Sequence, residues 1–143
     1  MPPTYFYLGI VLIILMHFIF PIIQIIHYPY TLIGILLIIF GMTLNFLAWL
    51  LFIKNKTTQN PFNDPNKFIV KGTYKISRNP MYLGMASTLF GAAIFLGSLI
   101  SFIFPIIFVY IIRVRFIHLE EKNMEKKFGK KYVNYKNSVR RWI

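Results

Sequence analysis

The chain has 143 residues, 57% of them hydrophobic, a formal net charge of +12 and no cysteine. Its length suits one domain, and the absence of cysteine excludes disulfide bonds and thiolate-bound metals. No Lys, Arg, Asp or Glu occurs in residues 1–53, which excludes an ordinary soluble domain, because the surface of a soluble domain carries charged groups throughout.

Four apolar runs follow one another along the chain, each close to the roughly 20 residues that a helix needs to cross a bilayer. They predict an all-α integral membrane fold with four transmembrane helices, at residues 5–26, 31–53, 81–100 and 101–117. The first run lacks the basic start and the small-residue cleavage site of a signal peptide, so we expect it to be a retained anchor. The whole chain, residues 1–143, is then a single membrane domain.

The basic residues fall into two regions, the polar loop 54–80 and the segment from Arg113 onward. Cytoplasmic segments of membrane proteins are enriched in Lys and Arg, so both regions, and with them both termini, should face the cytoplasm. The four helices then form two hairpins, with short uncharged turns on the other side. Basic residues that flank apolar runs favour contact with anionic lipid headgroups, and no nucleic-acid partner is expected.

Residues 118–143 predict a helical segment beyond the fourth span. The helix should continue to Gly129, and a second short helix should follow it. Apolar side chains recur at helical spacing and define one face of this segment, opposite a basic one: Phe128, Tyr132, Tyr135 and Val139. The pattern is typical of an amphipathic helix that lies at the membrane surface.

A dense polar cluster, Arg78-Asn79-Pro80, stands where the loop enters the third span. Asn is a favoured N-cap and Pro a favoured first helical residue, so the pair is expected to start the helix. Arg78 is placed less favourably, because a cation opposes the positive end of the helix dipole unless an anion joins it. Two interpretations stay open: Arg78 and the free amides of Met81 and Tyr82 hold an anion, or Arg78 pairs with lipid phosphate.

Three of the chain's four acidic residues lie close together, at Glu120, Glu121 and Glu125. One interpretation is that they pair with neighbouring lysines along the helix, in contacts worth roughly a few tenths of a kcal/mol. The other is that Glu120 or Glu121 faces a cation or a ribose diol. The three histidines have no partner at metal-ligand spacing, so no metal site is predicted. Arg78 could bind an anion and Glu120 or Glu121 a cation, at the same cytoplasmic end of the helices. Such a site suits a zwitterionic ligand with an additional positive charge.

The stretches GTYKISRNPMYLG and EEKNMEKKFGKKYVNYKNSVRRW, in this order, resemble the isoprenylcysteine carboxyl methyltransferase family and its bacterial phospholipid methyltransferase-like relatives. The resemblance covers residues 57–142, over half of the chain. It implies an enzyme of a bacterial inner membrane that binds S-adenosylmethionine at the cytoplasmic side, where the C-terminal helix closes the cofactor site. This cofactor carries a carboxylate, an ammonium and a sulfonium, the charge pattern inferred above.

The resemblance also implies which residues form the site, when the family's site positions are matched to this sequence. The catalytic residues would be Arg78, which orients the carboxylate of substrate or cofactor, and Glu121, the alternative to Glu120. The cofactor contacts would be Gln59, Asn66, Lys67, Phe68, Ile69, Tyr74, Asn79, Pro80, Met81, Tyr82 and Glu120.

The chain departs from the eukaryotic prenylcysteine enzymes at two places. Those enzymes have histidine at the position of Asn79, where asparagine is common in bacterial relatives. They also place a substrate-binding arginine one helical turn before the glutamate matched by Glu120. Phe116 stands there in this chain, and the adjacent Arg115 is the expected substrate contact.

The expected activity is methyl transfer from S-adenosylmethionine to a lipophilic, membrane-embedded acceptor, such as the carboxylate of an isoprenylcysteine-like substrate. One alternative is N-methylation of a phospholipid amine. The other alternative belongs to a different class, a non-enzymatic basic membrane protein that binds anionic lipid. Binding of a methyl donor separates the first two from the third.

Overall fold

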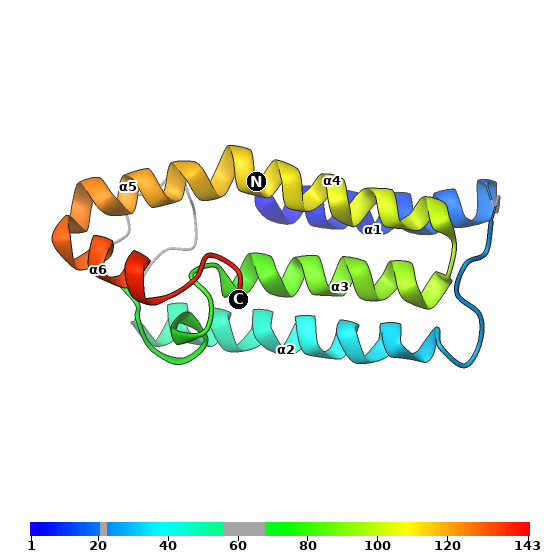
Figure 1. Cartoon of the computed structure of the whole chain (residues 1–143), viewed down its shortest axis with the longest axis horizontal. Coiled ribbons are helices and arrows are strands. Elements are labelled where there is room, and N and C mark those ends of the chain that lie inside the picture. The colour runs from blue at the N-terminus through cyan, green and yellow to red at the C-terminus, as the bar shows by residue number, and fades with distance from the viewer. Residues whose placement is uncertain (21–22, 56–67) are drawn as a thin grey trace.

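The computed structural model describes residues 1–20, 23–55 and 68–143. These residues form helices and connecting loops and contain no strand, apart from an isolated bridge between Gln24 and Ser98. Four apolar helices lie side by side, and α5, α6 and the loop before α3 gather at one end of them (Figure 1). The helices in chain order are α1 (Pro2–Ile19), α2 (Leu32–Asn55), the 3₁₀ turn η1 (Gly72–Lys75), α3 (Pro80–Leu96), the 3₁₀ turn η2 (Leu99–Phe102), α4 (Ile103–Ile111), the π-helical η3 (Ile112–Ile117), α5 (His118–Phe128) and α6 (Lys130–Ser138).

Three helical runs among the described residues are long and apolar enough to cross a membrane: Pro2–Ile19, Leu32–Asn55 and Leu99–Phe128. The fourth apolar helix, α3, has 17 residues, which is about 25 Å at the usual rise per residue. The all-α fold with long apolar helices is therefore confirmed. That α3 also spans the membrane, and that both termini are cytoplasmic, stay predictions.

The first predicted span, residues 5–26, extends too far, because α1 ends at Ile19. Phe20 precedes Pro21 and has φ −128° and ψ 70°, outside the helical region that a following proline disfavours. Residues 23–26 bond instead to the turn after α3, where the carbonyl of Gly97 accepts two of their amides, at 2.9 and 3.2 Å.

The third predicted span also ends early, at Leu96 instead of Ile100. Gly97 caps α3 with φ +73°, a left-handed conformation that favours glycine. A Cβ at this position would lie 2.2 Å from the carbonyl oxygen of Ile26. The close approach of the two loops therefore fixes where α3 stops.

The last helical run is continuous from η2 to the end of α5, so the predicted continuation to Gly129 is confirmed. Its 30 residues extend about 45 Å, more than the roughly 30 Å hydrocarbon layer of a bilayer. The polar α5 therefore projects past the apolar part of the run. The predicted second helix is shorter than expected, because α6 ends at Ser138 and Val139 has extended backbone.

Helix α2 packs on α3 through glycines that let the two backbones approach closely. A Cβ on Gly41 would lie 2.4 Å from the carbonyl oxygen of Gly84, and a Cβ on Gly34 would lie 2.4 Å from that of Gly91. Small residues at such a position let helices pack closely inside a membrane. The side chain of Asn45 donates to the carbonyl of Gly41 in its own helix at 3.1 Å.

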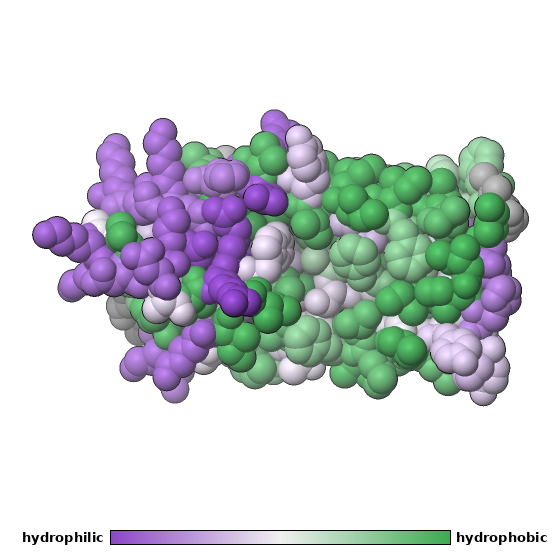
Figure 2. Space-filling view, viewed as in Figure 1, coloured by the Kyte–Doolittle hydropathy of each residue, from purple (hydrophilic) through white to green (hydrophobic). Residues whose placement is uncertain are grey.

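The core lies between α1, α3 and the last helical run, and its fully buried members include Ile13, Leu89 and Ile112. Apolar side chains cover the outer surface of the helices, and hydrophilic side chains gather at the end that holds α5 and α6 (Figure 2). This distribution suits helices that lie in lipid, with a polar end among headgroups or in water. The candidate site lies at that polar end.

Candidate functional site

The start of α3 forms one side of a polar cluster. Pro80 is the first residue of α3 and Asn79 holds the N-cap position, as predicted, but the Asn79 side chain makes no cap bond. Its amide group donates instead to the carbonyl of Arg141 at 3.1 Å, and its backbone N–H donates to Ser77 Oγ at 3.1 Å. The C-terminal residues therefore hold the first turn of α3.

Glu120, in α5, lies against this first turn. The hydroxyl of Tyr82 donates to Glu120 Oε1 at 2.5 Å. Within the described ranges, no Lys or Arg forms an ion pair with Glu120. Among the residues that the structure describes, this carboxylate therefore has a hydrogen-bond donor but no counter-charge.

The protonation of Glu120 reflects this environment. The residue lies past the apolar part of its helical run, and burial raises the pKa of its carboxyl to about 7, although the hydrogen bond from Tyr82 lowers it, and the charge of Glu121 raises it. Burial likewise raises the pKa of the Tyr74 hydroxyl, and the charge of Glu120 raises it further. Tyr74, Tyr82 and Glu120 thus act on one another as parts of one site.

Glu121, the next residue, is bound by two arginines from separate segments. Arg141 donates from Nε to Oε1 at 3.1 Å and from Nη2 to Oε2 at 2.7 Å, which raises the pKa of Arg141. Arg78 Nη1 lies 3.2 Å from Glu121 Oε1, and the side chains of Arg78 and Glu121 are each only 8% exposed. Two guanidinium groups against one carboxylate leave this cluster with a surplus positive charge.

Arg78 has hydrogen-bonding capacity to spare. Its buried Nε and Nη1 donate no hydrogen bond to any described residue, and the contact of Nη1 with Glu121 is an ion pair at 3.2 Å. A buried donor without an acceptor is costly. Arg78 and Glu120 are therefore opposite charges that a ligand carrying both signs would satisfy.

Helix α6 packs on the loop that leads to η1. The ring of Phe68 lies 5.5 Å from that of Phe128, 5.6 Å from Tyr132 and 5.1 Å from Tyr135. The hydroxyl of Tyr135 donates to the carbonyl of Tyr74 at 2.6 Å. Protein side chains thus cover the apolar face of this segment, which corrects the expectation that the face lies against the membrane.

Comparison with known proteins places the sequence of this chain in a family. The sequence family described as phospholipid methyltransferase matches residues 29–131, well over half of the chain. The chain belongs to this family. An uncharacterized protein of Haemophilus influenzae is 38% identical over 63 residues, which make up 44% of this chain and all of that protein. No solved structure matches the chain significantly.

Membership in the phospholipid methyltransferase family confirms the resemblance that the sequence indicated. The loop before α3, the first turn of α3 and α5 lie at one end of the bundle (Figure 1). These segments carry several residues implied by the resemblance: Phe68, Ile69, Tyr74, Arg78, Asn79, Pro80, Met81, Tyr82, Glu120 and Glu121. Gln59, Asn66 and Lys67 lie outside the described residues. Arg115 does not join this cluster, because it is exposed on η3 and its Nη1 donates to the hydroxyl of Tyr5 at 3.3 Å.

Arg141 belongs to the candidate site, although its position in the sequence does not indicate this. By pattern it belongs to the basic face of the last helix, yet it makes the paired hydrogen bonds to Glu121. The expected pairing of acids with lysines along α5 is wrong for Glu125 as well, whose Oε1 lies 2.5 Å from Lys136 of α6. Both contacts cross the turn at Gly129, so spacing within one helix could not have shown them.

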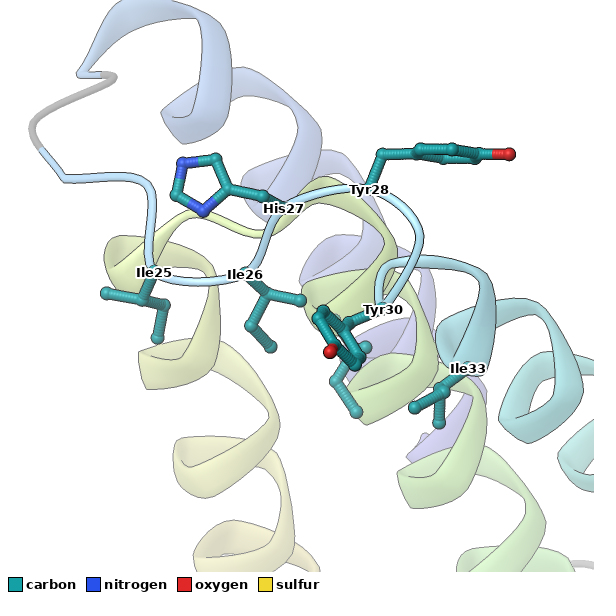
Figure 3. Close-up of a pocket in the computed structure, with 7 residues that line it drawn as sticks. Ile25, Ile26, His27, Tyr28, Tyr30 and Ile33 are labelled. Carbon is teal, nitrogen blue, oxygen red and sulfur yellow. The ribbon is translucent and has the colours of Figure 1, made fainter.

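A groove at the opposite end of the bundle is a poor candidate for the same ligand. It lies beside the α1–α2 loop and is lined by Ile25, Ile26, His27, Tyr28, Tyr30, Ile33 and Ile94 (Figure 3). Its lining residues include no carboxylate and no arginine. It therefore offers neither of the two charges that the polar end provides.

Replacing Glu121 with alanine is expected to destabilise the protein by roughly 3–5 kcal/mol, because two guanidinium groups lose their shared carboxylate in a largely buried place. Unfolding of the detergent-solubilised protein by heat or denaturant measures this loss. Glu125→Ala is the matched control: its pair with Lys136 is 37–39% exposed, so at most about 1 kcal/mol should be lost. Similar losses in the two variants would contradict the assigned structural role of Glu121.

Proposed function

We propose that this chain is an S-adenosylmethionine-dependent methyltransferase whose acceptor is a lipophilic molecule, a membrane lipid or a lipidated group. One observation carries the proposal. At the polar end of the bundle, Glu120 is a partly buried carboxylate that pairs with no cation among the described residues, and Arg78 is a buried guanidinium with donors that no described residue accepts. These residues fit a cofactor that carries a carboxylate together with two positive groups, and membership in the family supports the same conclusion.

In this proposal the residues of the chain bind the cofactor and orient it for methyl transfer. When bound, S-adenosylmethionine supplies a methyl group activated by its sulfonium. Glu120, steadied by Tyr82, would attract the positive part of the cofactor, and Arg78 would hold its carboxylate. The Arg78 side chain is buried and Glu120 is partly buried, which strengthens their electrostatic interactions, so catalysis would rest on positioning and on the exclusion of water.

The family match favours a phospholipid amine over a carboxylate as the acceptor. An ammonium group must lose a proton before its nitrogen can attack, whereas a carboxylate is already ionised at neutral pH. Methyl-labelled cofactor, offered with phosphatidylethanolamine vesicles or with a prenylated cysteine analogue, tests the choice. Treatment of the labelled product with mild base distinguishes the two outcomes. An N-methylated amine keeps its label, whereas a methyl ester is hydrolysed and releases labelled methanol. Transfer to neither acceptor would favour the non-enzymatic alternative, a basic protein that binds anionic lipid.

Cofactor binding is expected to weaken as the pH falls below about 7. Only the ionised carboxylate of Glu120 attracts a cation, and burial raises the pKa of this group, so lower pH favours the neutral form. Binding of a cation should also release protons, because it lowers that pKa. Calorimetry one pH unit above and below this value measures both effects. A pH-independent affinity in the wild-type protein, or the same pH dependence in Glu120→Gln, would contradict the assignment.

A further inference from the structure

The chain beyond α6 turns back toward the start of α3. Residues 140–143, called here the C-terminal strap, follow the extended Val139 and return from the tip of α5 and α6 (Figure 1). Trp142 packs against the core cluster shared by α1, α3 and the last helical run. The strap therefore connects the polar end to the interior of the bundle.

The backbone of the strap binds the three residues that lead into α3. The carbonyl of Arg140 accepts the N–H of Arg78 at 3.0 Å. The carbonyl of Arg141 accepts Ser77 Oγ at 3.2 Å and the amide group of Asn79 at 3.1 Å. These bonds involve backbone carbonyls only, so substitution of the strap side chains leaves the acceptors in place.

The side chain of Arg141, unlike the backbone of the strap, binds Glu121. Its guanidinium donates to both oxygens of Glu121. The ion pair that the structure describes between Arg78 and Glu121 joins Nη1 to Oε1. An arginine beside an otherwise free carboxylate tends to bind it through two parallel hydrogen bonds. If Arg141 were absent, Glu121 could take up Arg78 in that way, and Nε of Arg78 would no longer be available to a ligand.

We infer that Arg141 is a positioning residue for the methyl-transfer site: by occupying Glu121 it keeps the guanidinium of Arg78 free to hold an anion. This inference rests on the proposed function. A positioning role and a purely structural role of Arg141 predict different effects of removing its side chain. Removal of the Arg141 side chain leaves one arginine paired with one carboxylate, a combination that folding tolerates, while the anion-holding capacity of Arg78 is lost.

The test compares Arg141→Ala and Arg141→Lys with Arg140→Ala, in the full-length protein in detergent or vesicles. Arg140 is the matched control, since its side chain is exposed and only its carbonyl serves the loop. The readouts are kcat and KM for methyl transfer, the Kd of S-adenosylhomocysteine and the thermal unfolding midpoint. S-Adenosylhomocysteine keeps the carboxylate but lacks the sulfonium, so its affinity reports on the anion side of the site.

Arg141→Ala is expected to lower kcat about tenfold to a hundredfold and to weaken S-adenosylhomocysteine binding, with an unfolding midpoint near that of the wild type. Arg141→Lys should recover part of the activity, because it keeps the charge but not the paired hydrogen bonds. Arg140→Ala should behave like the wild type. Wild-type kcat in Arg141→Ala, or activity lost only in proportion to unfolding, would overturn the inference. A wild-type protein that binds no cofactor and transfers no methyl group would instead overturn the proposed function, and this inference with it.

Discussion

Replacing Glu120 with glutamine is expected to weaken S-adenosylmethionine binding about thirtyfold or more and to abolish turnover. Removal of one partner from a buried charge pair costs roughly 2–5 kcal/mol, and each 1.4 kcal/mol is about a factor of ten in affinity. Within the described residues, Glu120 is the carboxylate at the site that is not already paired with a cation. Calorimetric titration of the solubilised variant measures the effect.

Two controls make this result specific. Glutamine keeps an oxygen that can accept the hydrogen bond from the Tyr82 hydroxyl, so the thermal unfolding midpoint of the variant should stay close to that of the wild type. Glu125→Gln removes the same charge from the same helix, but its partner is Lys136 at the half-exposed tip, and cofactor affinity should not change. Unaltered binding in Glu120→Gln would remove this residue from the site.

Replacing Gly84 with alanine is expected to force α2 and α3 apart and to destabilise the protein by about 1–3 kcal/mol, as overpacking of tight interfaces does. The added Cβ would lie 2.5 Å from Asn45 Nδ2 and 2.6 Å from the carbonyl oxygen of Gly41. The latter atom is backbone and cannot move away alone. Since Gly84 is in the same helix as Tyr82, the shift should also weaken cofactor binding. Thermal unfolding and calorimetry on the same preparation measure both losses.

Gly9→Ala serves as the comparison, because it adds the same methyl group to an apolar helix. Its Cβ would lie 3.3 Å from Leu89 Cδ2, the end of a flexible side chain. We expect a clearly smaller change in the unfolding midpoint than for Gly84→Ala. Equal midpoints for the two variants would show that the glycine contact between α2 and α3 is looser than the structure describes.

The sequence was a good guide to the helices and a poorer guide to where they end. Long apolar runs identify a membrane helix because few other structures bury so many uncharged residues in succession, and α2 therefore matches its predicted range within two residues. The ends of α1 and α3 depend on each other, since residues 23–26 bond to the turn at Gly97. A contact between segments so far apart in sequence leaves no local pattern.

The same distinction applies to the site. Asn79-Pro80 marks the start of α3 through local preferences, and the pairing of Tyr82 with Glu120 brings together two motifs that the sequence had already singled out. Arg141 could not be recognised in this way, because one arginine among many basic residues carries no signal of a carboxylate twenty positions earlier. Its role depends on the turn at Gly129 and on the return of the strap, both products of tertiary packing.

The most direct test of this account is calorimetric titration of the full-length protein, in detergent and again in vesicles of native lipid, with S-adenosylmethionine and with S-adenosylhomocysteine. We expect both to bind at one site per chain, with affinity lost in Glu120→Gln and retained in Glu125→Gln. Absence of binding by folded protein in both detergent and lipid would contradict the proposed methyltransferase site at the start of α3.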